Sequence, residues 1–317
     1  MPPVSILIRC YNEEKHIGRL LRGIVQQNLD DVEIIVVDSG STDKTVSIVS
    51  KYATQVLSVR PEEFSFGRSL NVGLGAASGD FAVLASAHVY PLFTNWLERL
   101  LLPFEDPQVS CVYGKQIGNE MTKFSEHQVF AKWFPDKSNL KQDHPFCNNA
   151  NAAIRLEVWK AVPYNEELTG LEDIDWAYRA MQLDYRIAYQ ANAVVVHVHE
   201  ESPLQMYNRY RREAMALKRI FPNEHFHLGD FLRLFSGNVL SDYRHALRDG
   251  SLKRHWFDIQ RFRCMQFWGT YQGFARSGPV TSKLKRKFYY PEKTPRLGKN
   301  TLYDIKEGPL VDYRAGE

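Results

Sequence analysis

The chain has 317 residues, 44% hydrophobic and 24% charged, which is ordinary for a soluble globular protein of one large α/β domain or a domain plus an appendage. No apolar run reaches the ~18–20 residues of a membrane span, and no charged segment followed by an apolar one opens the chain, so we expect a cytoplasmic protein. Four cysteines without zinc-ligand or redox spacing predict buried, reduced thiols: Cys10, Cys111, Cys147 and Cys264.

Charge is unevenly distributed along the chain. Residues 1–199 carry 18 Lys and Arg against 24 Asp and Glu, a net charge of −6, whereas residues 200–317 carry 22 against 13, a net charge of +9. A basic C-terminal part favours an anionic partner for that half.

The first 115 residues alternate between strand and helix patterns. Apolar runs predict strands at Val4–Cys10, Val32–Asp38, Gln55–Val59, Phe81–Ala87 and Val109–Tyr113. Helical spacing predicts helices from Ile17 to Val25, after a cap near Ser41 or Thr42, at Ser69–Ala77 and at Asn95–Leu102. This alternation indicates a mostly parallel sheet covered on both faces, with ligands at the carboxyl ends of its strands. Those ends bring together Cys10–Asn12, Asp38–Gly40 and Ser86–His88.

The pattern loosens from about residue 116 and changes character after Pro203. The middle of the chain predicts strands at Ala150–Ile154 and Val194–His199 and helices at Glu157–Ala161 and Asp173–Gln182. Long amphipathic helices are predicted at Leu204–Phe221, Leu228–Leu247 and Leu252–Phe274. We therefore divide the chain into an α/β domain (1–202), a basic, aromatic-rich helical extension (203–277) and an irregular tail (278–317).

Two polar segments follow the first two predicted strands, Arg9–Glu14 (RCYNEE) and Val37–Asp43 (VDSGSTD). An acidic side chain at a strand end, here Asp38, can accept hydrogen bonds from a base or a ribose. The small residues that follow let a nucleotide approach the backbone. Taken alone, the second segment is equally well explained as a capped turn.

Together with later motifs, these segments resemble glycosyltransferase family 2. The resemblance rests on CYNEE, on VVDSGSTDKT, on Asn71-Val72-Gly73 before Ala77-Ser78-Gly79-Asp80, and on Leu171-Glu172-Asp173 with Trp176 and Arg179. It spans roughly residues 4–200. It implies a GT-A fold, which is an α/β, Rossmann-like and mostly parallel sheet, and inverting transfer from a nucleotide-sugar donor.

The resemblance also implies roles for individual residues. The donor nucleotide would lie against Arg9, Tyr11, Asn12, Glu13, Asp38, Ser39, Arg68 and Asn71. Asp173 would be the base that takes the acceptor proton, with Glu172 as the alternative base or an acceptor-orienting group. On local grounds alone, the acidic first turn of this predicted helix would simply suit its dipole. Asn149 and Trp176 are candidate contacts to sugar. The alternatives are that Asn149 is a turn residue and that Trp176 lies in the core.

The chain departs from the family at the metal motif. Where the family has Asp-x-Asp, this sequence has Ser86-Ala87-His88, similar to a bacterial rhamnosyltransferase-like subgroup that also shares Val112–Gln116 and Asn148–Arg155. A divalent cation, Mn²⁺ or Mg²⁺, usually neutralises the leaving diphosphate. Two interpretations stay open: His88 binds such an ion, or it hydrogen-bonds the phosphate or the acceptor directly. The subgroup favours dTDP-L-rhamnose as the donor.

Two late histidines, His197 and His199, are candidates to complete the metal shell. They alternate along a predicted strand, so at most one of them should face the site, and we favour His199 because it lies nearest the end of the run. The alternative is that either one is simply structural.

The basic C-terminal part admits two interpretations. Cations and aromatics alternate in the helix after Pro203 and in Lys283–Tyr290, as they do in segments that lie on anionic membranes. Peripheral association with the inner face of the plasma membrane would suit a lipid-linked acceptor. The alternative is a solvated helical surface or one that forms a homo-oligomer. No nucleic-acid-binding module is recognisable.

The sequence thus predicts an inverting transferase that moves a sugar from a nucleoside diphosphate to a hydroxyl of a bacterial glycan, in surface polysaccharide synthesis. The alternative is a catalytically inactive GT-A module that binds glycans or scaffolds an assembly. Retention of Glu172 and Asp173 argues against it. A nucleotidyltransferase is disfavoured because the first turn, Tyr11-Asn12-Glu13, is not a glycine-rich phosphate loop.

Overall fold

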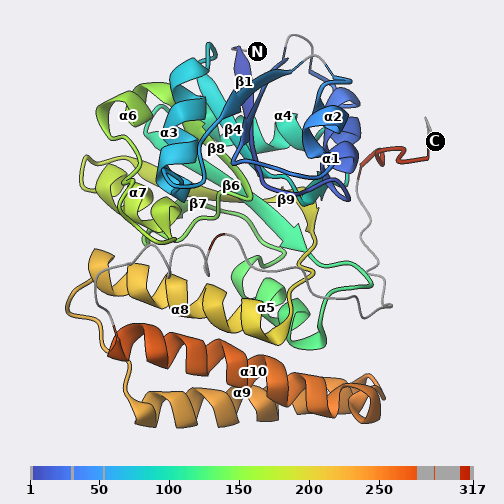
Figure 1. The fold of residues 1–317 in the computed structure, drawn as a ribbon, viewed down its shortest axis with the longest axis vertical. Coiled ribbons are helices and arrows are strands. Elements are labelled where there is room, and N and C mark those ends of the chain that lie inside the picture. Colours follow the sequence, from blue (N-terminus) through green and yellow to red (C-terminus); the bar gives the residue numbers. More distant parts are fainter. Residues whose placement is uncertain (1–2, 30–31, 53, 277–288, 290–307, 315–317) are drawn as a thin grey trace.

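The computed structural model describes residues 3–29, 32–52, 54–276, 289 and 308–314. A nine-stranded sheet forms the body of the described chain, with helices on both of its faces and three long helices stacked at one end (Figure 1). The strands are β1 (Val4–Cys10), β2 (Val32–Asp38), β3 (Gln55–Ser58), β4 (Phe81–Ser86), β5 (Val89–Pro91), β6 (Val109–Ile117), β7 (Asn139–Gln142), β8 (Asn151–Arg155) and β9 (Arg186–His197).

The strand order is β3-β2-β1-β4-β8-β6-β9-β5, with β7 also pairing with β9. The first four strands of this order are parallel, whereas β8 runs antiparallel to both β4 and β6. Strand β6 then pairs in parallel with β9. The carboxyl ends of β1, β2 and β4 therefore lie at one edge, as the sequence predicts.

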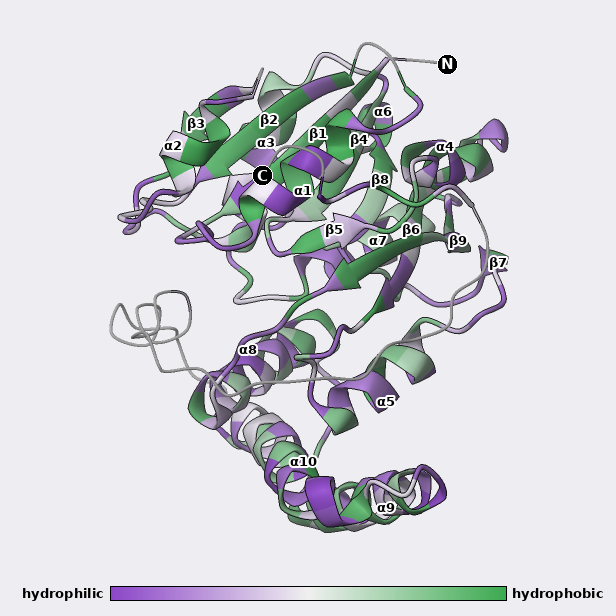
Figure 2. Cartoon of the chain, turned by 90° about the vertical axis from the view of Figure 1, so that its right-hand side faces the viewer, coloured by the Kyte–Doolittle hydropathy of each residue, from purple (hydrophilic) through white to green (hydrophobic). Residues whose placement is uncertain are grey.

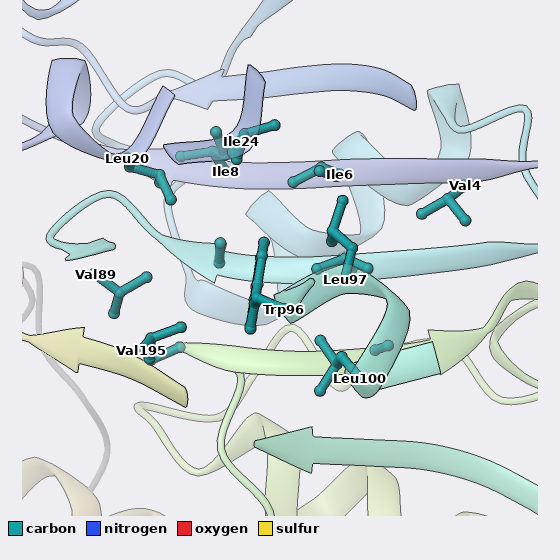
Figure 3. Packing of buried hydrophobic residues seen from close by; sticks show 14 of the residues in the cluster. Val4, Ile6, Ile8, Leu20, Ile24, Val89, Trp96, Leu97, Leu100 and Val195 are labelled. Carbon is teal, nitrogen blue, oxygen red and sulfur yellow. The ribbon is translucent and has the colours of Figure 1, made fainter. Parts of the chain in front are cut away.

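Alternate residues of β1 point to opposite faces of the sheet and build two cores. On one face Ile6 and Ile8 pack with residues of α1 (Ile17–Val25) and α4 (Trp96–Leu101); Figure 3 shows Leu20, Ile24, Trp96, Leu97 and Leu100 in this cluster. On the other face Leu7 packs with residues of α3 (Phe66–Ala76) and α7 (Glu172–Met181). Burial of each such side chain contributes roughly 1.5–3 kcal/mol. The ends of the sheet are thereby held rigid around the polar loops.

The three predicted C-terminal helices are confirmed as α8 (Pro203–Ile220), α9 (Leu228–Arg248) and α10 (Leu252–Ala275). Ser202 and Gln205 form a capping box that fixes the start of α8. Gly269 and Gly273 let helix α10 lie close to α8. A Cβ at either position would come within 2.6 Å of an α8 backbone oxygen. Arg263 of α10 pairs with the buried Asp242 of α9 at 2.8 Å.

The remaining elements are short: α2 (Thr45–Val49), α5 (Phe124–Trp133), α6 (Leu156–Ala161) and a 3-10 turn, Leu102–Glu105. Helix α2 begins later than the predicted cap near Ser41 or Thr42, because the Ser41 hydroxyl accepts the Asn12 N–H instead. Residues 308–314 return to the sheet, where Leu310 bridges to Phe93. Within the described ranges, no helix is both long and apolar enough to cross a membrane.

Candidate active site

A cleft of about 560 Å³ opens at the carboxyl ends of β1 and β4. Most of its walls come from five segments: the loop after β1, the end of β4, the turn before β8, the start of α7, and the chain from the end of β9 into α8. Its lining includes Arg9, Tyr11, Asn12, Glu13, Ser86, His88, Asn149, Glu172, Asp173, His197, His199, Arg209 and Arg212. The structure thus brings together most of the residues that the sequence singles out.

The two acidic residues of α7 lie at one end of this cleft and have different partners. Arg9 donates to Glu172 at 3.2 Å and also lies over the ring of Phe66. Asp173 instead accepts the backbone N–H groups of Asn149 at 3.3 Å and Ile174 at 2.9 Å. Leu171, directly before them, has a left-handed backbone with φ of 55°. Such a conformation is costly for leucine and turns the start of the helix into the cleft.

These surroundings make Asp173 a weak acid. Burial and, after it, the neighbouring Glu172 charge raise the pKa of Asp173 to about 7, although the two N–H donors and Arg9 oppose the shift. A carboxyl group with a pKa near neutral can accept a proton and release it again at physiological pH. Two adjacent carboxyl groups whose environments differ in this way are typical of acid–base sites.

Asn149 borders the same end of the cleft. Its side-chain oxygen accepts the Tyr164 hydroxyl at 3.3 Å, while its Nδ2 is buried without a partner among the described residues. A buried donor without an acceptor is costly, so an oxygen atom of a bound molecule would stabilise it.

Three histidines form the other end of the cleft. A ring nitrogen from each of His88, His197 and His199 lies within 4.8 Å of the other two. Each Nδ1 lies 2.7 Å from an oxygen acceptor: Glu13 for His88, Gln116 for His197 and Glu126 for His199. The expectation that at most one late histidine faces the site is wrong. Strand β9 ends at His197, so the alternation of side chains no longer applies by His199.

The pKa values of the histidines shift in different directions. Burial lowers the pKa of His88, but the Glu13 carboxylate outweighs it and leaves a net rise. Burial, assisted by the charges of its histidine neighbours, lowers the pKa of His197 well below its ordinary range. Behind them Arg209 pairs with Glu201 at 2.8 Å and with Glu126 at 3.4 Å. Burial raises the pKa of Glu201, but Arg209 outweighs it and lowers that pKa to about 2. The pKa of Glu126 is also lowered against burial, chiefly by His199 and then by Arg209.

The predicted nucleotide residues divide into three groups, of which the third, Arg68 and Asn71, lies outside the cleft. Arg9, Tyr11, Asn12 and Glu13 line the cleft. Asp38 and Ser39 are buried, and Asp38 accepts the N–H groups of Gly40 at 3.1 Å and Ser41 at 3.0 Å. The Asp38 carboxylate therefore shapes its own turn.

Three predicted site residues lie elsewhere. Arg68 pairs with Glu166, and Asn71 donates to the backbone of Tyr164 and to Glu166, so both hold a neighbouring loop and neither is among the cleft residues. Trp176 is fully buried and donates to the Val162 carbonyl, so it cannot stack on a sugar. The core alternative for Trp176 is correct, since its position faces the sheet.

The sequence motifs did not point to the groups behind the histidines. Gln116, Glu126 and Arg209 come from β6, α5 and α8, far apart in the chain. Each belongs to an amphipathic segment where a polar residue is unremarkable, so only the fold brings them to the cleft.

Comparisons with known proteins agree with this geometry. The family model described as Glycosyl transferase family 2 matches residues 5–162. The O-antigen chain rhamnosyltransferase WbaN of Salmonella anatum is 31% identical over 222 residues, which cover 66% of this chain and 70% of that protein. The chain belongs to glycosyl transferase family 2. A further relative of this glycosyltransferase is the O-antigen chain rhamnosyltransferase RfbN of Salmonella typhimurium, 26% identical over 65% of this chain and 70% of that one.

Solved structures confirm the GT-A fold class of this family 2 glycosyltransferase. The mannosyltransferase PcManGT from Pyrobaculum calidifontis, in complex with GDP-Man and Mn²⁺, has a TM-score of 0.57 at 18% identity and covers 92% of this chain and 88% of its own. Glucosyl-3-phosphoglycerate synthase from Mycobacterium tuberculosis, in complex with Mg²⁺ and UDP, has a TM-score of 0.53 at 19% identity, with 71% and 81% coverage.

Proposed function

We propose that this glycosyltransferase inverts the anomeric carbon as it moves a sugar from a nucleoside diphosphate to a hydroxyl of a bacterial surface glycan. The observation that carries the proposal is the pairing at the start of α7. Glu172 is neutralised by Arg9, while Asp173 is left with a pKa of about 7. That arrangement supplies Asp173 as a base, while the second buried carboxylate, Glu172, has its charge compensated by Arg9.

Asp173 is the proposed catalytic base. The acceptor oxygen forms a bond to the anomeric carbon on the face opposite the leaving group, and the bond from that carbon to the diphosphate oxygen breaks. The diphosphate departs with the electron pair, and the acceptor proton passes to Asp173. Asn149 is proposed to offer its unpartnered Nδ2 to a sugar or phosphate oxygen beside this base. Glu172 is proposed to position Arg9 and the acceptor.

The opposite end of the cleft is proposed to hold the donor. Tyr11 and Asn12 are proposed to contact the nucleoside, with the Asp38–Ser39 turn supporting the loop beneath them, since Asn12 accepts the Thr42 N–H at 2.8 Å. A divalent cation would be held by His88 and His199, whose converging ring nitrogens fit one. Bound there, such an ion supplies positive charge to the leaving diphosphate. PcManGT with Mn²⁺ and the synthase with Mg²⁺ support a cation in this fold.

The donor is proposed to be dTDP-L-rhamnose, and the acceptor a lipid-linked or soluble surface glycan. Support comes from the O-antigen chain rhamnosyltransferases WbaN and RfbN, which match about two-thirds of this chain.

The decisive test is a thermal-shift panel of UDP, GDP, dTDP and CMP, each with Mn²⁺, Mg²⁺ or EDTA. A ligand at 100 times its Kd stabilises the folded state by about 2.7 kcal/mol, and we expect dTDP to stand out. Release of dTDP from dTDP-L-rhamnose with acceptor glycan then establishes turnover. A folded protein that responds to no nucleotide would contradict the proposal and favour an inactive glycan-binding module.

We further propose that α9 and α10 rest on an anionic membrane surface. Hydrophobic residues run along both helices at the end of the molecule far from the sheet (Figure 2). Trp256 and Phe257 of α10 are 51% and 55% exposed and follow Lys253 and Arg254 in sequence. Aromatic groups beside cations are typical of interfacial helices. Of the basic segment Lys283–Tyr290, only Tyr289 lies within the described residues.

This placement is tested by co-sedimentation with vesicles of phosphatidylglycerol and phosphatidylcholine. The Trp256→Ser and Phe257→Ser double variant should bind several-fold more weakly. A matched control is Leu102→Ser, which removes a similarly exposed side chain at the other end of the molecule. Equal binding by parent and double variant would favour the solvated or oligomer-forming alternative.

A further inference from the structure

All three histidines of the cleft lie close to one another. His88 follows β4, whereas His197 ends β9 and His199 lies two residues beyond it. The ring centroids of His197 and His199 are 4.0 Å apart, and that of His88 lies 5.1 Å and 5.8 Å from them. Three rings from two separate strand ends therefore converge on one point.

The oxygen atom behind each ring fixes its tautomer. Glu13 and Glu126 carboxylates and the Gln116 carbonyl oxygen are acceptors only, so each Nδ1 must carry the proton that it donates. The Nε2 lone pair of a neutral ring is then directed away from this partner. Metal-ligating histidines almost always donate their other N–H to a carboxylate or carbonyl in this way. Gln116 is oriented by its own donation to Asn148 at 3.0 Å.

His197 supplies the second, independent observation. Its Nε2 is buried and has no hydrogen-bond partner among the described residues, and the whole residue is only 5% exposed. A polar atom buried in this way costs free energy unless something binds it. A cation between the three rings would satisfy it.

We propose that His88, His197 and His199 form a three-imidazole site for one divalent transition-metal ion, which this cleft binds in preference to Mg²⁺. The proposal rests on the proposed function only in taking this end of the cleft as the donor site. Imidazole nitrogen suits Zn²⁺ and related transition metals such as Co²⁺ and can still bind Mn²⁺, whereas Mg²⁺ prefers an all-oxygen environment. His197, less favoured than His199 on sequence grounds, becomes a ligand.

The ligand type also changes the charge at the site. A pair of carboxylate ligands cancels most of a divalent charge, whereas three neutral imidazoles leave it in place for the anion that binds there. Here the carboxylates Glu13 and Glu126 lie one layer back, where they polarise the rings without occupying coordination positions. Three protein ligands leave positions open for ligand oxygens.

The test is direct metal binding to the full-length apoprotein, without any sugar nucleotide. Co²⁺ is titrated by its visible absorption, and Mn²⁺, Zn²⁺ and Mg²⁺ by competition. We expect one equivalent of Co²⁺ with a nitrogen-ligand spectrum, Mg²⁺ at least ~100-fold weaker, and a loss of at least ~10-fold in Co²⁺ affinity for H197Q. The matched control is H225Q, which removes an exposed histidine close to His227 and should leave the titration unchanged.

Mg²⁺ that binds as tightly as Co²⁺, or H197Q that keeps the parent affinity and spectrum, would overturn the proposal. If H197Q does not fold, judged by its melting curve, the more exposed H88Q decides in its place. Failure of the proposed function is separate. A protein that binds Co²⁺ as described but releases no nucleoside diphosphate keeps its metal site and loses its assignment. A protein that releases nucleoside diphosphate but does not bind Co²⁺ keeps its assignment and loses its metal site.

Discussion

At one end of the cleft Arg9 pairs with Glu172, and the adjacent Asp173 accepts only backbone N–H groups within the described chain. At the other end carboxylates pair with rings, since Glu13 and Glu126 each hold a histidine Nδ1. Both ends bury charge, but the first leaves a carboxyl group able to take a proton and the second leaves ring nitrogens able to bind a cation. At each end, the pairing of one charged group leaves its neighbour free to react: Asp173 beside the paired Glu172, and the ring nitrogens opposite the paired Nδ1 atoms.

The largest effect is expected from Asp173→Asn. An amide of the same shape cannot take the acceptor proton, so we expect kcat to fall by about 10²–10⁴-fold, measured as release of nucleoside diphosphate. The control is Asp175→Asn on the same helix, which removes only an ion pair with Arg179 and should stay within a few-fold of the parent. Activity above a tenth of the parent value in Asp173→Asn would mean that the base is elsewhere.

The same carboxyl group predicts the pH dependence of activity. With a pKa of about 7, Asp173 is protonated below neutral pH, so kcat/KM should fall about tenfold per pH unit below 7 and level off above it. A profile that is flat between pH 5.5 and 8 would separate catalysis from this group.

The same group predicts that folding stability falls as pH rises, whereas activity increases. The pKa of Asp173 is raised above its ordinary value of 3.8, so the group opposes folding increasingly as pH rises from about 4 to about 7. Asp173→Asn removes that opposition. We expect the variant to melt at or above the parent temperature at pH 8, with the difference vanishing below pH 4. A lower Tm at pH 8 would contradict the assigned environment.

The sequence predicts the sheet well because its strands are buried on both faces and read as continuous apolar runs. Val4–Cys10 and Val32–Asp38 are predicted and found with the same bounds. The three long C-terminal helices agree within a residue or two, since their apolar spacing is regular. Strands β5 and β7 were not predicted, because three or four residues at a sheet edge carry too little pattern.

Within the site, the sequence predicts residues near motifs and misses those that act through them. His88, Glu172 and Asp173 lie at strand and helix ends, where topology alone places them in the cleft. The partner of Glu172, Arg9, is 163 residues away, and no local pattern shows that contact. For the same reason the sequence leaves Trp176 open between a sugar contact and a core residue, and only its burial decides for the core.

Removal of Arg9 tests whether the carboxylate end depends on neutralising Glu172. In Arg9→Met the Glu172 charge faces Asp173 without its partner, so the pKa of Asp173 should rise further. We expect the acidic limb of the kcat/KM profile to move about one pH unit toward alkaline pH. Arg9→Lys keeps the positive charge, so its acidic limb should lie close to that of the parent. If the change in Arg9→Met came only from a general loss of binding, the position of the limb would not depend on this charge.

The smallest effect is expected behind the rings, at Glu126→Gln. The amide oxygen can still accept from His199, but the charge that polarises the ring is lost. Removing such a partner outright typically weakens metal affinity ~10–100-fold, and the conservative change should therefore cost about fivefold in the Co²⁺ titration. Glu224→Gln, at an exposed position, is the matched control. An unchanged Co²⁺ affinity in Glu126→Gln would show that the carboxylate serves only to pair with Arg209. Charge pairing would then set the role of the reactive group at the carboxylate end of the cleft but not at the histidine end.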